Sequence, residues 1–306
     1  MLFVSSVYLI AMIPEFPVFT KITIDLKEPI RKFLANFESY SDFNYTSLYS
    51  WDYNYSSEIC YLNHNLVIKI PDYITGSPTY SILGTQLLDD SIAMLLKYTK
   101  EINLVPEVTI NSIRNKNVIE IQEDRDNYDY IYELENLVDL PGKGHKLKRN
   151  KLNQFDKAYP NHALADFTES IALNAESYND LFISWARERN RSNQEIQMEQ
   201  VALSRLLLSA DELGLISMEL KIDGLLAGFS VCEVISDELS ICHFQKALFK
   251  YNFADVKLTH FTSQILFDNK CTYINWEQDL GLLGLRQLKE TYRPYKYLKK
   301  YTIRAV

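Results

Sequence analysis

The strongest constraint on the fold is a hairpin sequence in the second half of the chain. Residues 216–222 and 225–234 are rich in apolar residues that favour strands, and Asp223 and Gly224 between them form a typical two-residue hairpin turn. The sequence then predicts a third strand at 239–244, a helix at 254–267 and a fourth strand at 273–276. This order predicts an α+β fold with a mixed, mostly antiparallel sheet.

The other predicted elements rest on periodicity and on turn residues. Apolar residues at helical spacing predict helices at 26–37, 87–99, 165–174, 178–190 and 199–214. Apolar or alternating runs predict strands at 66–70 and 130–134, and short strands or strand–helix connections at 108–110 and 118–121. Residues 124–129 are interpreted as a charged surface loop. Pro141 and Gly142 open a strong turn signal, so we place a domain boundary there.

Composition permits a substantial core and divides the charge unevenly. The 306 residues suit two domains or one large one, and 47% hydrophobic residues exclude disorder for most of the chain. The net charge of -8 combines -10 in residues 1–142 with +2 in residues 143–306. We therefore expect an anionic partner, such as a nucleic acid, to meet the second half.

The N-terminus and the cysteines indicate a cytoplasmic protein. The apolar run at residues 1–13 has no preceding Lys or Arg and is shorter than the roughly 20 residues that span a bilayer. Met12 offers a second translation start, which would make residues 1–11 an extension. The cysteines form no C-x-x-C pair, so no zinc or redox motif is predicted, and buried thiols fit a reducing compartment. No transmembrane segment is predicted.

Polar residues directly after the strand at 273–276 predict a functional site. Asn275, Glu277 and Asp279 follow one another at every second position, so in extended chain they share a face. Two close carboxylates raise the pKa of one of them, which suits deprotonation of an attacking amine or hydroxyl. The two carboxylates could equally hold cations in a salt-bridge network.

Cations follow these carboxylates and complete the predicted site. Gly281 and Gly284 allow a tight turn or a close approach to a ligand, and Arg286 and Lys289 come next at helical spacing. We expect Glu277 or Asp279 to act as the base and Asn275 to orient the acceptor. Arg286 and Lys289 would bind the phosphates of the donor.

His243 and Lys246 lie at the end of the third predicted strand and extend the site. Histidine could act as a general base and lysine could stabilise an oxyanion, although a single histidine in a strand is more often structural. Glu199, in a predicted helix, could be a buried polar partner of the network that Glu277 and Asp279 would form with Arg286 and Lys289. No metal-ligand arrangement or Ser-His-Asp arrangement is predicted.

Ordered stretches of this sequence resemble the C-terminal catalytic domain of bacterial phosphatidylglycerol lysyltransferases. The resemblance covers roughly residues 20 to 300, and each stretch is weak alone. Besides residues 273–294, the stretches are Ser41-Asp42, Leu48 to Trp51, Asp129 to Tyr132, Leu140 to Lys143, Lys148 to Phe155, Trp185, Glu199 and His243 to Ala247.

This resemblance implies two tandem acetyltransferase-like (GNAT) domains, each a mixed, mostly antiparallel sheet flanked by helices. We place them at residues 1–140 and 141–306, the second carrying the active site. The strand and helix order of residues 216–276 is that of a GNAT core. The lysyltransferases owe their membrane location to an added multi-span domain, and no such segment is predicted in this sequence.

The resemblance also implies an acyl- or aminoacyl-transferase. It would move an activated acyl group from an aminoacyl-tRNA or acyl-CoA co-substrate to an amine or hydroxyl of a small molecule or lipid. No tightly bound cofactor is expected. GNAT domains cradle the coenzyme A pyrophosphate on a Gly-rich loop, but the corresponding residues 250–255 contain no glycine and end in Asp255. We therefore expect weak binding of acetyl-CoA, which agrees with an aminoacyl-tRNA donor.

Two basic stretches are candidate contacts for RNA. Lys148 and Arg149 belong to a cluster at residues 143–151, which is either a phosphate contact or a solvated helix face. Tyrosines alternate with cations at residues 286–304, a pattern that suits nucleic-acid stacking or a last strand. We favour a strand at 297–303. The alternative functions are a non-catalytic ligand-binding protein that retains the GNAT fold and, less favoured, a sequence-specific nucleic-acid binder.

Overall fold

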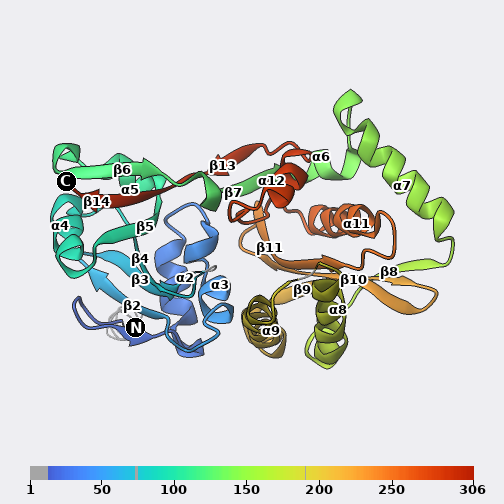
Figure 1. Ribbon diagram of the computed structural model, residues 1–306, viewed down its shortest axis with the longest axis horizontal. Helices are drawn as coiled ribbons and strands as arrows, with labels where there is room; N and C mark the ends of the chain where they lie inside the picture. Colours follow the sequence, from blue (N-terminus) through green and yellow to red (C-terminus); the bar gives the residue numbers. More distant parts are fainter. Residues whose placement is uncertain (1–12, 73–74, 190) are drawn as a thin grey trace, which may run out of the picture. The chain divides into compact units, whose positions relative to one another are not determined.

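The computed structural model describes residues 13–72, 75–189 and 191–306 and has an α+β fold with mixed sheets (Figure 1). Apart from Ile13, the apolar N-terminal run lies outside the described residues. Within these residues, no helix combines the length and the apolar character needed to cross a membrane. The chain forms two compact units, described separately below. Unit 1 comprises residues up to Asp129 together with Gln278–Leu282 and Leu298–Val306, and unit 2 comprises Tyr130–Glu277 and Leu283–Tyr297.

Unit 2 therefore begins before the predicted boundary after residue 140, and the end of the chain returns to unit 1.

Unit 1 contains two antiparallel sheets. The first has the order β1-β2-β3-β4, and the second places the C-terminal strand β14 between β5 and β6. The strands are β1 (Thr20–Lys21), β2 (Glu58–Leu62), β3 (Asn65–Pro71), β4 (Pro78–Leu83), β5 (Glu101–Pro106), β6 (Ile119–Glu123) and β14 (Lys300–Ala305).

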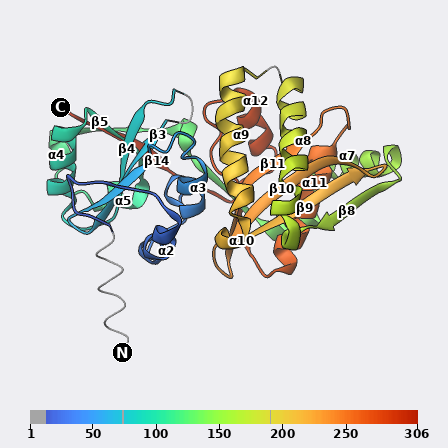
Figure 2. The same ribbon diagram turned by 90° about the horizontal axis from the view of Figure 1, so that it is seen from below.

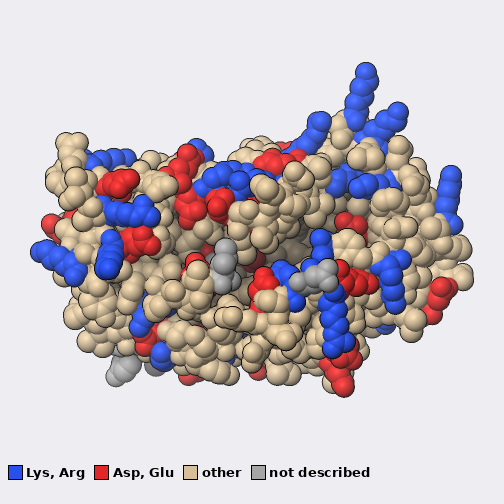
Figure 3. Space-filling view, in the orientation of Figure 1, with Lys and Arg blue, Asp and Glu red and all other residues tan. Residues whose placement is uncertain are grey.

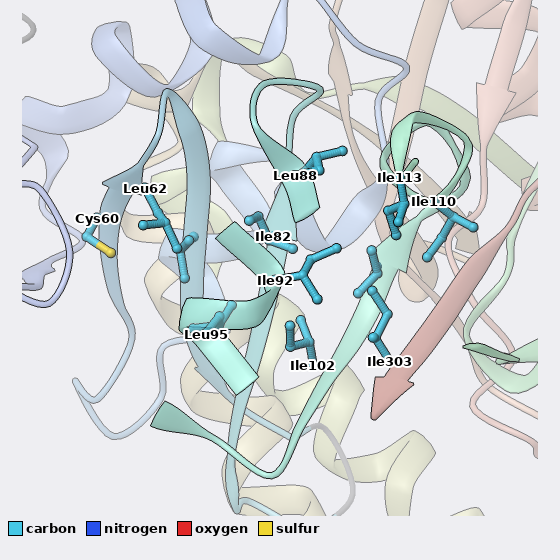
Figure 4. Close-up of a cluster of buried hydrophobic side chains, with 12 residues drawn as sticks. Cys60, Leu62, Ile82, Leu88, Ile92, Leu95, Ile102, Ile110, Ile113 and Ile303 are labelled. Atoms are coloured by element: carbon cyan, nitrogen blue, oxygen red, sulfur yellow. The ribbon is translucent and has the colours of Figure 1, made fainter. Parts of the chain in front are cut away.

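The core of unit 1 unites apolar residues from both ends of the sequence (Figure 4). Helix α4 (Leu88–Tyr98) contributes Leu88, Ile92 and Leu95, which recur at helical spacing on one face. Ile303 of β14 is fully buried in the same cluster. The C-terminal strand is thus part of the core. The other helices of unit 1 are α2 (Lys27–Leu34), α3 (Tyr45–Ser50) and α5 (Glu107–Ser112).

The sheet that dominates unit 2 has seven strands in the order β13-β7-β12-β11-β10-β9-β8, and β11 and β12 in it pair in parallel. Asp223 (φ 51°) and Gly224 (φ 78°) both have positive φ between β9 and β10, which confirms the predicted two-residue hairpin turn. The strands are β7 (Asp129–Glu133), β8 (His162–Asp166), β9 (Leu215–Ile222), β10 (Leu225–Val234), β11 (Leu239–Ala247), β12 (Tyr273–Asn275) and β13 (Lys296–Leu298).

Helices cover both faces of this sheet (Figures 1 and 2). Tyr178 of α8 stacks on Phe229 of β10, whereas Thr262 of α11 hydrogen-bonds to Ser230, the next residue of β10. Because successive strand residues point to opposite faces, α8 and α11 lie on opposite sides of the sheet. The helices of unit 2 are α6 (Leu134–Asp139), α7 (Lys146–Ala158), α8 (Ala175–Glu188), α9 (Asn193–Leu208), α10 (Ala210–Leu213), α11 (Ala254–Asp268) and α12 (Leu283–Glu290).

Two predicted segments depend on context that the local sequence does not fix. Residues 108–110, interpreted as a short strand or a strand–helix connection, are part of α5, which begins after the extended Pro106 with Glu107 in its first turn. The helix predicted at 165–174 begins instead as the end of β8, where Ala165 pairs with Glu219 of β9. Asp166 then accepts hydrogen bonds from Thr168 and ends the strand in a turn. Pairing with a distant strand overrides the local pattern.

Candidate functional site

A buried histidine between two glutamates forms the centre of the candidate site in unit 2. His243 Nε2 lies 3.2 Å from Glu233 Oε2, and Nδ1 lies 3.2 Å from Glu277 Oε1. The His243 and Glu233 side chains are almost fully buried, whereas the Glu277 side chain retains 19% of its exposure. Glu277 is therefore the member of the trio that a substrate can reach.

A β-bulge gives His243 its position. The register of β10 with β11 pairs Val231 with Phe244 and then Cys232 with Cys242, so His243 is left without a partner in the ladder. Such bulges re-aim one side chain and are common next to active sites. The sequence shows only an alternating strand here, and the bulge could not be read from it.

The two glutamates keep His243 protonated. Burial alone would lower the pKa of this imidazole, but the hydrogen bonds and charges of Glu233 and Glu277 raise it from 6.5 to about 9. A raised pKa disfavours the general-base role considered from the sequence. Both ring nitrogens lie beside glutamates, so His243 is placed to orient Glu277.

This raised pKa predicts a pH-dependent contribution to stability. The folded-state pKa of about 9 exceeds the unfolded value of 6.5, so the contribution is complete below pH 6.5 and is lost as pH rises through 9. We expect His243→Gln to cost about 3 kcal/mol at pH 6, because a shift of one unit corresponds to about 1.4 kcal/mol. Urea unfolding at pH 6, 7.5 and 9.5 should show the cost shrinking. A cost that stays constant over this range would contradict the account.

The loop after β12 is held by two of the predicted site residues. Asn275, fully buried, accepts the Glu277 N–H at 2.7 Å, and Lys289 Nζ donates to the carbonyls of Trp276 and Glu277 at 2.5 and 3.1 Å. Lys289 is 8% exposed. These side chains fix the backbone that carries Glu277, so Lys289 is not placed as an open phosphate ligand. Arg286 lies half-buried in α12.

Asp279 belongs to unit 1 and is not placed as an accessible base. Its side chain is fully buried, 3.3 Å from Arg125 NH1, and accepts the Gly281 N–H at 2.9 Å. Glu277 (φ 54°) interrupts the extended chain, so the expected shared face with Asp279 does not form.

The two glycines of this segment differ in their surroundings. Gly281 has φ 71°, and a Cβ there would meet Asp126 at 2.8 Å, so this position requires glycine. Gly284 lies in open space.

Lys246 and Glu199 form an ion pair in unit 2. Lys246 Nζ lies 2.7 Å from Glu199 Oε1 and 4.1 Å from the ring centroid of Trp185, on α8. Arg191 lies 3.6 Å from the other Glu199 oxygen. Glu199 is thus a polar partner of Lys246 and Arg191, two cations outside the network expected for it. Lys246 can donate three hydrogen bonds, so one bond to Glu199 leaves donors for a ligand.

The basic cluster at residues 143–151 is less open than its composition indicates. Lys148 is 4% exposed with Nζ 3.3 Å from the ring centroid of Tyr292, and burial lowers its pKa to about 8. Arg149 donates to the carbonyls of Leu140 and Gly142 and so holds the turn before α7. Lys148 is therefore not placed as an open phosphate contact, and the expected RNA contact through the half-buried Arg149 stays a prediction.

Three backbone N–H groups of the loop at residues 250–255 already donate hydrogen bonds within the protein. The Tyr251 and Ala254 N–H groups donate to carbonyls of the same loop region, and the Asn252 N–H donates to the Tyr159 hydroxyl at 2.9 Å. Phe253 adopts φ 65° before α11. A pyrophosphate cradle needs free N–H groups, and these three are occupied.

A hollow is visible on the surface of unit 2 in Figure 3. In the same view in Figure 1, the labels α11 and α12 lie above this area and the labels α8 and α9 lie below it. Charged side chains of both signs surround the hollow.

In the part of the chain that the structure describes, no group of His, Cys, Asp and Glu is arranged to hold a metal ion. The four cysteines are buried and free.

Unit 1 contains a buried ionic cluster that sequence reasoning missed. Lys300 Nζ contacts Asp42 and lies 2.8 Å from Asp129 Oδ1 and 3.2 Å from Ser41 Oγ. Burial lowers the pKa of Lys300, but Asp129 and Asp42 raise it above its usual value overall. Lys300 and both aspartates are fully buried. Ser41, Asp42 and Asp129 carry the family resemblance, which was the one available signal.

The sequence matches the family described as "Phosphatidylglycerol lysyltransferase, C-terminal" over residues 85–304. The chain belongs to this family. It is thus a member of a transferase family, as the resemblance implied. The comparison with curated proteins gives no match.

Solved structures share the fold. A conserved protein of unknown function from Bacteroides thetaiotaomicron has a TM-score of 0.80 at 24% identity, covering 94% of this chain and 99% of that one. L-PGS from Bacillus licheniformis has a TM-score of 0.60 at 12% identity, covering 95% and 93%. The C-terminal domain of a putative lysylphosphatidylglycerol synthetase from Agrobacterium fabrum has a TM-score of 0.59 at 9% identity, covering 91% and 92%. At these identities the likeness concerns the fold alone.

Proposed function

We propose that this protein is an aminoacyltransferase that moves an amino acid from an aminoacyl-tRNA to the hydroxyl group of a lipid, with lysyl-tRNA and phosphatidylglycerol as the first pair to test. The family match over residues 85–304 carries this proposal. We also propose that units 1 and 2 are tandem GNAT-like domains and that unit 2 holds the catalytic residues.

Glu277 is the proposed base. It takes the proton of the attacking hydroxyl, whose oxygen bonds to the acyl carbon while the ester bond to the tRNA ribose breaks. The ribose oxygen leaves with a proton. The 19% exposure of the Glu277 side chain supports this role, and the protonated His243 orients the carboxylate from behind.

Lys246 is the proposed stabiliser of the oxyanion. Its ammonium keeps a fixed position between Glu199 and the Trp185 ring, so it need not reorganise when charge develops on the acyl oxygen. Asn275 and Lys289 act through the backbone of the loop that carries Glu277. They are positioning residues.

Acetyl-CoA is expected to bind weakly, because the N–H groups of Tyr251, Asn252 and Ala254 are already paired and the loop contains no glycine. Isothermal calorimetry should detect no binding at micromolar concentrations. Micromolar affinity that is lost on removal of the coenzyme A diphosphate would show that the loop rearranges to bind phosphate, and would contradict this prediction.

A non-catalytic binding protein is the second candidate. The observation that favours it is the pairing of the predicted catalytic groups, because Asp279 is bound by Arg125 and Lys246 by Glu199. Such a protein would bind a ligand and show no turnover.

A donor panel separates the candidates. Wild-type protein is incubated with phosphatidylglycerol vesicles and either radiolabelled aminoacyl-tRNAs or acetyl-CoA, and label in the lipid fraction is counted. The proposal expects lipid label from an aminoacyl-tRNA. Label from acetyl-CoA alone would overturn the tRNA donor, and no turnover with any donor would favour the binding protein.

A further inference from the structure

An exposed group of cations and aromatic rings lies where α8 ends and the loop after β11 begins. This Arg-aromatic patch consists of Trp185, Arg187, Arg189, Phe249 and Lys250. Phe249 keeps 50% of its exposure, and Arg187, Arg189 and Lys250 are exposed. In Figure 3, Lys and Arg side chains gather below the hollow, over the area of α8.

The patch is held in a defined arrangement. The Phe249 N–H donates to Glu188 Oε2 at 2.7 Å and so fixes the loop to the end of α8. The Arg189 guanidinium lies 3.8 Å from the ring centroid of Phe249 and 5.9 Å from that of Trp185. On the same indole ring lies Lys246 Nζ, at 4.1 Å. Rings and cations therefore alternate in the order Phe249, Arg189, Trp185 and Lys246. The series ends at the Lys246–Glu199 pair.

The balance of charge at the patch is positive. Arg187, Arg189 and Lys250 are joined by Arg191 and Lys246, and the nearby carboxylates are fewer. Asp255 interacts with Arg189, Glu188 holds the loop, Glu195 is paired with Arg191, and Glu199 is paired with Lys246 and Arg191. This agrees with the charge of the two halves of the sequence, -10 and +2. An anionic partner is favoured at this surface.

Alternating cations and exposed rings match unpaired nucleic acid. Cations bind the phosphates, and aromatic faces stack on bases that are not already stacked in a duplex. We propose that the Arg-aromatic patch binds the unpaired end of an RNA chain, with a base on Phe249 and phosphates on Arg189 and Lys250. That the nucleic acid is RNA rests on the proposed function. The alternating rings and cations would then lie along the path of the aminoacyl end of the donor towards Lys246.

The test uses the full chain and a fluorescein-labelled single-stranded RNA tetranucleotide, with a blunt RNA duplex as comparison. Fluorescence anisotropy is measured from about 50 to 200 mM salt, where phosphate contacts weaken steadily. We expect the single strand to bind in preference to the duplex. Phe249→Leu should weaken binding roughly fivefold or more, because stacking on one base is lost.

Arg189→Ala should lower the salt slope by about 0.7, the value for one phosphate contact to a single strand. Lys157→Ala is the matched control, because Lys157 is an exposed cation on α7 of the same unit. It should change neither value. Equal binding of duplex and single strand, an unaffected Phe249→Leu variant, or no binding at about 50 mM salt would overturn the proposal.

The two proposals can fail separately. Suppose that wild type transfers an amino acid from aminoacyl-tRNA, while Phe249→Leu and Arg189→Ala keep full RNA affinity. The RNA-binding role of the patch would then be wrong, and the proposed function would remain. If binding of the tetranucleotide depends on the patch but no donor gives transfer, the proposed function would be wrong, and the RNA-binding role of the patch would remain.

Discussion

Lys300→Met should destabilise the protein by about 3–5 kcal/mol, the cost typical of removing one partner from a buried ion pair. The ammonium of Lys300 lies 2.8 Å from Asp129 Oδ1 and contacts Asp42, and the side chains of all three residues are fully buried. Without it, two carboxylates stay buried with no cation between them. Urea unfolding followed by circular dichroism measures the loss.

Lys299→Met is the matched control. Lys299 is the preceding residue, its side chain is 42% exposed, and it lies 4.0 Å from Glu107 and 3.8 Å from Glu123. Exposed pairs of this kind contribute about 0–1 kcal/mol. Adding Asp42→Asn and Asp129→Asn to Lys300→Met should recover part of the loss. If Lys300→Met costs no more than Lys299→Met, the cluster is not a determinant of stability.

Glu277→Gln should slow aminoacyl transfer by about 10²–10⁴-fold, the usual contribution of a general base. The amide keeps the shape of the side chain and can still accept from His243 Nδ1, but it cannot take the proton of the acceptor hydroxyl. The free energy of unfolding should fall by less than for His243→Gln, because Glu233 still pairs with the imidazolium. Initial rates at saturating lysyl-tRNA measure the effect.

Glu238→Gln is the control for this variant, because Glu238 is an exposed glutamate of the same unit. It should leave the rate unchanged. A Glu277→Gln variant that keeps more than about a tenth of the wild-type rate would remove Glu277 from the role of base.

Asp279→Asn, by contrast, should mainly lower the free energy of unfolding, because Asp279 is buried against Arg125.

Local chemistry explains which parts of the fold could be predicted from the sequence. The hairpin at Asp223 and Gly224 was predictable because two residues with positive φ fix the turn. Helix α4 was predictable because its buried face repeats at helical spacing. By contrast, Ala165 enters a strand only because β9 is available to pair with it.

The candidate site was less predictable because its contacts join distant parts of the chain. Lys300 and Asp129 are 171 residues apart, and His243 and Glu277 are 34 apart. The sequence identified Glu277, Lys246 and Glu199 as candidates, but it could not show that Asp279 is buried in unit 1 or that Lys148 packs on Tyr292. Residue type alone does not distinguish a cation on the surface from one that is buried.

A single-turnover experiment tests the central claim most directly. Protein in excess is mixed with radiolabelled lysyl-tRNA and phosphatidylglycerol vesicles, and samples are quenched over time. The account predicts that label appears in the lipid at the rate at which it leaves the tRNA, and that Glu277→Gln holds the tRNA without forming labelled lipid. Label that stays on the tRNA with wild-type protein, or that appears only as free lysine, would contradict the account.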